Sequence, residues 1–204
     1  FLRYHLLCTY PQVRQQRLFK LIRDQVKSTA EVFALLDELE ERAELFAALS
    51  DADHEYWIEN AGAKPYIREL NMFRVKQMTP LLFAAWGRLS APNFVSILRL
   101  VSIISFRYSV ISGLNPNELE PAYHYAARSI LEGRARTPKD VFDQLRQIYV
   151  ADAKFRQDFA SKEIQTSGSR RHLVKYILAK LESELAMRPV DYESDPSTIE
   201  HILP

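Results

Sequence analysis

The spacing of apolar residues along the chain is the feature that most restricts its fold. Apolar side chains recur at intervals of three and four residues, and only five of the 204 residues are glycine. Intervals of three and four place side chains on one face of an α-helix, whereas a half-buried strand requires strict alternation. We therefore predict an all-α protein, an irregular multi-helix bundle with a short extended C-terminal segment. No helical-solenoid repeat is evident.

Composition and charge exclude several classes of protein. Hydrophobic residues make up 47% of the chain, enough for a sizeable core, and Lys plus Arg number 27 against 26 Asp plus Glu. A formal charge of +1 gives no overall attraction to nucleic acid, so any DNA contact must come from local patches. The single cysteine, Cys8, excludes an internal disulfide framework and fits a cytoplasmic location. We expect Cys8 to be a small buried hydrophobe.

The most apolar stretch lies between residues 94 and 111. It contains Arg99, Arg107 and several serines, so we interpret it as part of a central core helix that begins at Pro92, not as a bilayer span. No signal peptide is visible, and we expect no membrane partner.

Local signals place the starts of several helices. Ser28 and Glu31 have the spacing of a capping box, which predicts a helix from about Thr29 to Leu49. Thr137 followed by Pro138 predicts another start, because a hydroxyl cap and a proline at the first position both favour one. The inward stripe of the first helix is expected to consist of Val32, Leu35, Leu36, Leu39, Ala43, Phe46 and Leu49. Further helices are expected at 11–26, from Pro65, 80–86, 118–131, 151–162 and 171–186, with 11–26 pairing antiparallel to 29–49.

Four parts are predicted along the chain: an N-terminal helical hairpin subdomain (1–62), a main helical bundle (63–187), an acidic, proline-containing linker (188–197) and a strand (198–204). The last part alternates in the manner of a strand, and a lone strand is unstable without partners. The chain also begins at Phe1, without an initiator Met. We therefore expect it to be an interior piece of a longer protein.

Four stretches, in order, resemble the GmrSD-type restriction endonucleases: residues 73–86, 106–115, 172–178 and 198–204. Members of that family join an N-terminal ParB-like nucleotide-hydrolysing domain to a C-terminal His-Asn-His (His-Me finger) nuclease through a helical region. The resemblance covers residues 60–204 and implies that this chain is the helical region plus the first nuclease strand. It implies a parent enzyme that hydrolyses DNA phosphodiesters in antiviral defence, with nucleotide bound only in the N-terminal domain.

The same resemblance implies site residues. The histidine that matches His201 is a general base that activates water for attack on a DNA phosphodiester, a role that suits neutral imidazole. Glu200, directly before it, is implied as a ligand of a divalent metal, magnesium or manganese. The asparagine and the second metal-binding residue of the family would lie beyond Pro204. This polypeptide alone is therefore not expected to cut DNA.

Two groups of basic residues are candidates for contact with DNA phosphate. Positive charge at the start of a helix opposes the helix dipole unless an anion lies near, and phosphate is such an anion. An acidic side chain of the bundle, or solvent, accounts for the same pattern. The two groups are Arg170, Arg171, His172 and Lys175 at a predicted helix start, and Arg134, Arg136 and Lys139 in a loop.

Other polar and aromatic residues are interpreted as structural. Charged heads within aromatic-rich stretches are expected to pair inside the bundle, and aromatic residues at helical spacing to lie in the core. The histidines outside the C-terminal segment have no ligand-spaced partners. The ion pairs are expected to join Arg74, Lys76 and Arg107 to Glu69 and Glu120. The aromatic residues expected in the core are Trp57, Trp86, Tyr108, Tyr123 and Tyr125. The histidines without ligand-spaced partners are His5, His54 and His124.

Two other functions fit the same residues. One is a non-catalytic helical protein-interaction module in which His201 is incidental. The other is a helical DNA-binding module that uses the two basic groups. An oligomer is compatible with each of the three functions.

Overall fold

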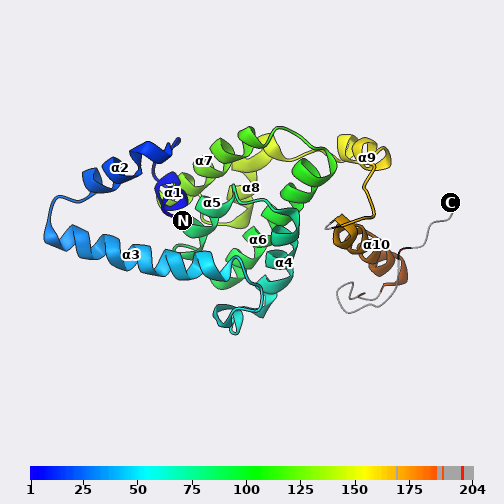
Figure 1. The fold of residues 1–204 in the computed structure, drawn as a ribbon, viewed down its shortest axis with the longest axis horizontal. Coiled ribbons are helices and arrows are strands. Elements are labelled where there is room, and N and C mark those ends of the chain that lie inside the picture. The colour runs from blue at the N-terminus through cyan, green and yellow to red at the C-terminus, as the bar shows by residue number, and fades with distance from the viewer. Residues whose placement is uncertain (169, 188–189, 191–198, 200–204) are drawn as a thin grey trace. The chain divides into compact units, whose positions relative to one another are not determined.

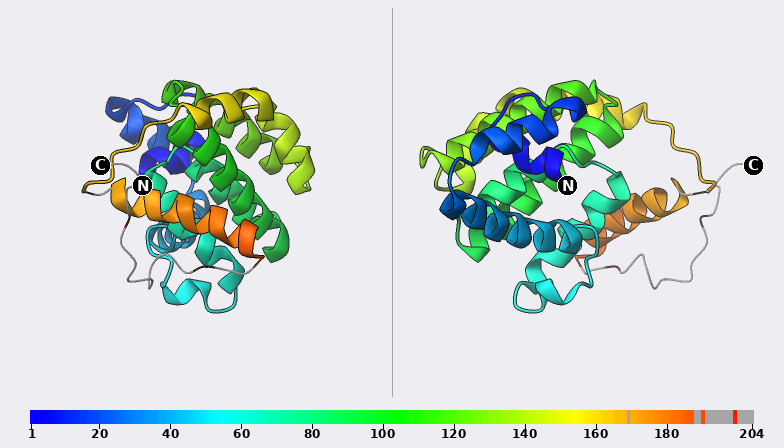
Figure 2. Two further views of the ribbon diagram at one scale, coloured as in Figure 1. Left: turned by 90° about the vertical axis from the view of Figure 1, so that its right-hand side faces the viewer. Right: turned by 60° about the vertical axis from the view of Figure 1, so that its left-hand side comes forward.

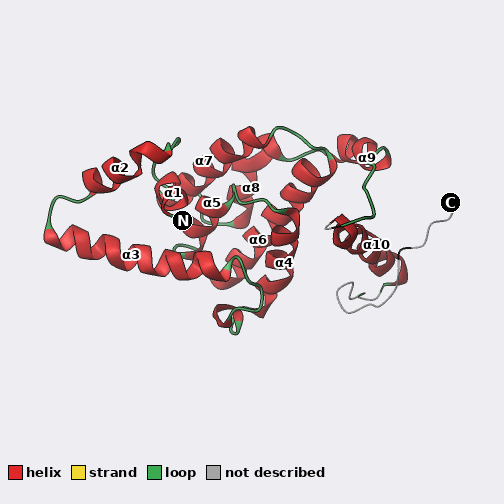
Figure 3. Cartoon of the chain, viewed as in Figure 1, coloured by secondary structure: helices red, strands yellow, loops and turns green. Residues whose placement is uncertain are grey.

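The computed structural model describes residues 1–168, 170–187, 190 and 199. These residues form helices and loops and contain no strand (Figures 1 and 3). The predicted all-α class is confirmed. The predicted linker and strand, 188–204, lie outside the described residues except for Val190 and Ile199.

Most helices follow the local start signals, but the helix expected at 11–26 begins at Leu18, and α1 (Leu2–Leu7) lies before the first predicted helix. Short 3-10 turns precede or follow several of them, and a π-helical turn, η4 (Phe106–Ile111), continues α6. The α-helices are α1 (Leu2–Leu7), α2 (Leu18–Gln25), α3 (Thr29–Ala48), α4 (Lys64–Phe73), α5 (Thr79–Trp86), α6 (Ala91–Ser105), α7 (Leu119–Leu131), α8 (Pro138–Leu145), α9 (Asp152–Ala160) and α10 (Arg170–Ala186).

Contacts divide the chain into two compact units, residues 1–158 and 159–204. The predicted boundaries at 62, 187 and 197 stay predictions. Within the first unit, Leu45 and Trp57 join the same hydrophobic core as Phe94 and Tyr123, so the N-terminal segment shares a core with the helices after it.

Both predicted helix caps are present. The Ser28 hydroxyl accepts a hydrogen bond from the Glu31 amide at 3.3 Å, and the Glu31 carboxylate accepts one from the Ser28 amide at 3.0 Å. Thr137 and Asp140 make the same reciprocal pair at the start of α8. Such pairs satisfy backbone N–H groups that have no partner inside the helix.

Helix α5 is the most deeply buried element of the first unit. Every residue from Thr79 to Ala85 is buried, and the helix packs mainly against α7 and α6. A helix that is apolar on all sides is stable only when other helices surround it. Its start at Thr79 agrees with the boundary predicted from Pro80.

Aromatic packing joins the end of α3 to α5 and α6. The Trp57 indole N–H donates to the carbonyl of Ala48 at 2.8 Å, and Trp57 is fully buried. The rings of Trp86 and Phe94 meet edge to face, with centroids 4.8 Å apart. The predicted core positions of Trp57, Tyr108 and Tyr123 are confirmed, and Trp86 is half-buried against the core.

Tyr125 was predicted to lie in the core, and this is wrong: its side chain is 59% exposed. Tyr123 and His124 already face the core, and one further step of about 100° around the helix turns the next residue away. The aromatic character of Tyr125 did not indicate which side of the helix it occupies.

The predicted inward stripe of α3 is also wrong along most of its length. Val32 and Leu36 are 41% and 53% exposed, and the buried residues of the helix are Leu45 and Ala48 near its C-terminal end. Helix α2 packs against α1. The loop at residues 26–28 joins α2 to α3, and the two helices diverge with distance from this loop (Figures 1 and 2). The predicted pairing of 11–26 with 29–49 is therefore not found.

Ala91–Ile111 is long and apolar enough to cross a membrane, judged by length and composition among the described residues. Half of it is buried in the protein, and Phe94, Ile97 and Leu98 lie in the core of the first unit. Core helices pass the same test of composition, so the expectation of no membrane partner stays a prediction.

Gly113 generates a prediction about stability. Its φ is +58°, a backbone conformation that favours glycine, and a Cβ there would meet no atom within 4 Å. Gly113→Ala should lower the free energy of unfolding in urea by about 1 kcal/mol through backbone strain alone. Gly87→Ala is the matched control, because Gly87 has a φ of −74° and its added Cβ would lie 3.9 Å from the nearest atom. Equal effects of the two changes would contradict the prediction.

His5 generates a prediction about pH. Its Nδ1 lies 2.8 Å from the Arg42 guanidinium, which must donate, so the ring is neutral. Burial first, and the Arg42 charge second, lower the pKa of His5. The unfolded chain then binds the extra proton at a higher pH than the folded one. As the pH falls below about 6.5, towards the lowered folded pKa, the free energy of unfolding should decrease by up to about 1.4 kcal/mol per pH unit.

Urea unfolding at a series of pH values tests this expectation. His5→Gln is the matched variant, because its amide oxygen accepts from Arg42 but does not titrate. The variant should show a flatter dependence on pH than the wild type. The same slope in both proteins would show that another group causes it.

Candidate functional site

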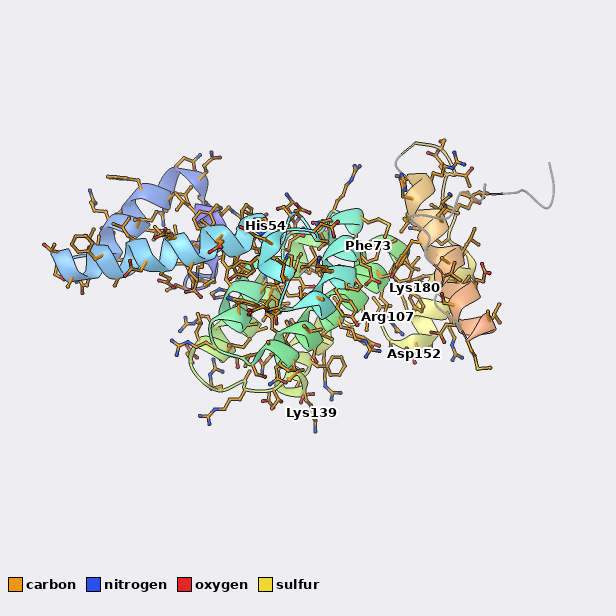
Figure 4. The ribbon with its side chains drawn as sticks, turned by 90° about the horizontal axis from the view of Figure 1, so that it is seen from below. His54, Phe73, Arg107, Lys139, Asp152 and Lys180 are labelled. Atoms are coloured by element: carbon orange, nitrogen blue, oxygen red, sulfur yellow. The ribbon has the colours of Figure 1, made fainter. Side chains whose placement is uncertain are left out.

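Arg107 holds the chain that follows α8 against the helical bundle. Its guanidinium donates to the carbonyl oxygen of Val150 at 2.8 Å and to Oδ1 of Asp152 at 2.7 Å. It also lies over two rings, with its Cζ 4.9 Å from the Tyr149 centroid and 4.5 Å from that of Phe155. We call Arg107, Tyr149, Val150, Asp152 and Phe155 the Arg107 junction; Figure 4 labels Arg107 and Asp152, which lie side by side.

Local backbone structure positions both sides of this junction. Arg107 lies in η4, where the Ser112 amide donates to the Arg107 carbonyl across five residues at 3.0 Å. A π-helical turn contains an extra residue, which changes the direction in which the following side chains project. Asp152 opens α9, where a carboxylate is favoured by the helix dipole as well as by Arg107. The groups around the guanidinium, a carboxylate, a carbonyl oxygen and two aromatic rings, all favour a positive charge.

The predicted partners of Arg107 are wrong. Glu120 instead pairs with Arg3 at 2.7 Å, and the Glu69 carboxylate accepts a hydrogen bond from Ser102 at 2.5 Å. Arg74 and Lys76 were expected inside the bundle, but both are exposed. Sequence spacing identified Arg107 as a charge within an aromatic-rich segment, and the partner came from residue 152, which only the packing of α9 brings near.

The predicted basic loop is largely occupied by its own neighbours. Glu132 accepts hydrogen bonds from Arg134 and Arg128, and these hydrogen bonds first, with the positive charges of the two side chains after them, lower its pKa. The Arg136 guanidinium donates to the Gly133 carbonyl at 2.9 Å. Lys139 is exposed at the start of α8 (Figure 4). This loop is therefore less suited to phosphate than its sequence indicated.

The other basic group lies at the start of α10, in the second unit. Arg170 and Arg171 are exposed, and no acidic residue occupies the first turn of the helix. Lys175 is half-buried, one turn further along. The structure places these cations on adjoining turns, and their contact with phosphate stays a prediction.

His201 and Glu200, the predicted base and metal ligand, lie outside the described residues. Within the part of the chain that the structure describes, no three His, Cys, Asp or Glu side chains gather in the manner of a metal site. The described residues therefore give no support for a metal bound elsewhere in the chain.

The other histidines and the cysteine have structural contacts. The His54 ring accepts from the Tyr56 amide at 3.2 Å, and the buried His124 ring donates to the Leu7 carbonyl at 2.6 Å. Cys8 is 1% exposed, and burial raises the pKa of its thiol to about 11. The prediction that Cys8 is a small buried hydrophobe is confirmed, and the thiol is unsuited to nucleophilic chemistry.

A cavity of about 370 Å³ lies beside α1 and the start of α7. Arg3, Val13, Asn117 and Glu120 are among the residues that line it. Arg3 and Glu120 pair with each other, which leaves Arg14 as the other charged residue of the lining, and one exposed cation does not define a ligand.

Comparison with known families identifies the C-terminal part of the chain. Residues 149–204 match the family model of the GmrSD restriction endonucleases, C-terminal domain. No curated protein and no solved structure matches the chain. This part of the chain is therefore related to restriction endonucleases of the GmrSD type, as the sequence resemblance indicated. The matched segment begins at Tyr149, which is the first residue after α8 that belongs to the Arg107 junction.

The junction generates a prediction about stability. Arg107→Met keeps the aliphatic stem but removes two charge-assisted hydrogen bonds and two ring contacts. The free energy of unfolding in urea should fall by about 2 kcal/mol. The amide of Phe155, which donates to the carbonyl of Ala151 at 2.9 Å, should also exchange with solvent faster.

Arg99→Met is the matched control, because Arg99 is exposed on the same helix, α6. Surface substitutions of this kind usually change stability by less than about 0.5 kcal/mol. If the two variants unfold at the same urea concentration, the junction contributes nothing measurable.

Proposed function

We propose that this chain is the helical connector of a longer GmrSD-type restriction endonuclease that acts in the cytoplasm in antiviral defence. The observation that carries this proposal is the family match at residues 149–204. Its first residues, Tyr149–Phe155, are held by Arg107 against the bundle that precedes them.

The position of this contact supports a relay through the connector. A shift of α6 or η4 displaces Arg107, and with it the start of α9, since four contacts join them. Chains of packed side chains and hydrogen bonds can carry coupling between distant sites. In the proposed parent, nucleotide binding in a preceding ParB-like domain alters cleavage through this contact. A parent whose cleavage ignored nucleotide would contradict the relay.

His201 is the proposed general base, and Glu200 a proposed ligand for magnesium or manganese. Neutral imidazole takes a proton from water near neutral pH. A divalent cation, when bound, stabilises the negative charge that develops on the phosphodiester. Arg170, Arg171 and Lys175 are proposed to contact DNA phosphates on the way to that site.

Cleavage by the proposed full-length parent tests the assignment of His201. Modified and unmodified plasmid are incubated with magnesium or manganese and either the wild type, His201→Ala or His172→Ala. Loss of the base should slow cleavage by about 100-fold or more, as loss of general-base catalysis does. His172 is exposed at the start of α10, and its variant controls for loss of a surface imidazole.

The other outcomes separate the alternatives. Cutting that survives His201→Ala places the base elsewhere. Absence of cutting on every substrate favours the non-catalytic interaction module. Binding of this chain to duplex DNA that weakens steeply with salt favours the DNA-binding module, because phosphate contacts release counterions.

A further inference from the structure

Helices α2 and α3 form an arm that exposes large apolar side chains. Phe19 on α2 is 77% exposed, while Phe33 and Leu36 on α3 are 61% and 53% exposed. Single exposed apolar residues are ordinary, but Val32, Phe33 and Leu36 adjoin one another on one helix. This surface has the character of an interface.

The two segments of the arm, residues 14–27 around α2 and residues 28–48 around α3, carry opposite net charge. Residues 14–27 contain five basic side chains and one acidic, whereas residues 28–48 contain six acidic side chains and one basic. Among the described residues no ion pair joins α2 to α3, and the pairs present in the arm are local: Arg23 with Asp24, and Arg42 with Glu38. Most of the charge on each helix is thus available to a partner.

We propose that the arm binds the arm of a second copy of this chain, with α2 of each copy against α3 of the other. In a two-fold dimer the same patch occurs on both sides and must be self-complementary. A basic helix and an acidic helix that cross between copies satisfy this condition twice. Phe19 of one copy then packs near Phe33 and Leu36 of the other.

The charges of the arm favour a second copy of the arm over other classes of partner. DNA, or a membrane surface rich in anionic lipid, attracts α2 but is repelled by the six carboxylates of the α3 segment. A uniformly acidic or basic peptide likewise complements one helix only. A second arm complements both, and electrostatic complementarity of this kind fixes register and partner.

Charge reversal in two separate variants tests the proposal. The first variant carries Lys20→Glu and Arg23→Glu on α2, and the second carries Asp37→Lys and Glu40→Lys on α3; all four residues are exposed. Each variant alone sets like charges against each other at the four substituted positions, and it should dimerise at least about tenfold more weakly in sedimentation equilibrium, a loss of about 1.4 kcal/mol. An equimolar mixture should recover the dimer, since both crossed contacts regain opposite charge.

Two controls separate the interface from general effects. A variant with Arg99→Glu and Lys139→Glu carries the same change of net charge as the first arm variant, but away from the arm, and it should dimerise like the wild type. Circular dichroism should show that all variants are equally helical. Added salt should weaken the wild-type dimer, because exposed charge pairs are screened.

Three results would overturn the proposal. A wild-type chain that is monomeric at its highest soluble concentration has no such dimer. A dimer that both arm variants preserve uses another surface. Failure of the mixture to recover the dimer would mean that the crossed charge pairs do not form, and that the arm meets a different segment or protein.

Discussion

The burial of α5 is the constraint on which the first unit depends. Its residues from Thr79 to Ala85 have no face suited to water, so neighbouring helices must enclose it. Helices α6 and α7 supply most of that enclosure, and α1 and the C-terminal end of α3 complete it. Helices that are distant in sequence, α1, α3 and α7, thus pack around one short apolar segment.

The Arg107 junction lies at the edge of this core, where Arg107 binds the chain at residues 149–155. The family match begins at residue 149, while the division into compact units falls after residue 158. The first ten residues of the matched segment therefore belong structurally to the bundle. The half-buried guanidinium of Arg107, with two rings and two oxygen partners, resists displacement, because each contact constrains its direction. The start of the matched segment is thus packed with the helical bundle that precedes it.

The positions at which helices start were predictable from sequence, whereas the packing of one helix against another was not. The caps at Ser28 and Thr137, and the start of α5 at Thr79 beside Pro80, depend on residues within one turn of each other. The exposure of Tyr125, and the pairing of Arg107 with Asp152, depend on which helix packs where. Sequence spacing identified Arg107 as a charge that needed a partner, but it could not identify a partner that lies 45 residues away. His201 and Glu200, outside the described residues, stay predictions.

The exposed stripe of α3 shows why a periodic pattern has two interpretations. Val32, Leu35, Leu36 and Leu39 recur at helical intervals, which predicts a face that excludes water, but the pattern does not state which molecule covers that face. In the described structure only Leu45 and Ala48 of this helix are fully covered by the chain itself. A stripe selected only for folding would end where the core ends, yet this one continues along the helix and is bordered by acidic residues. An apolar centre with a charged border is the composition of a protein interface, and the basic helix that complements it belongs to the same arm.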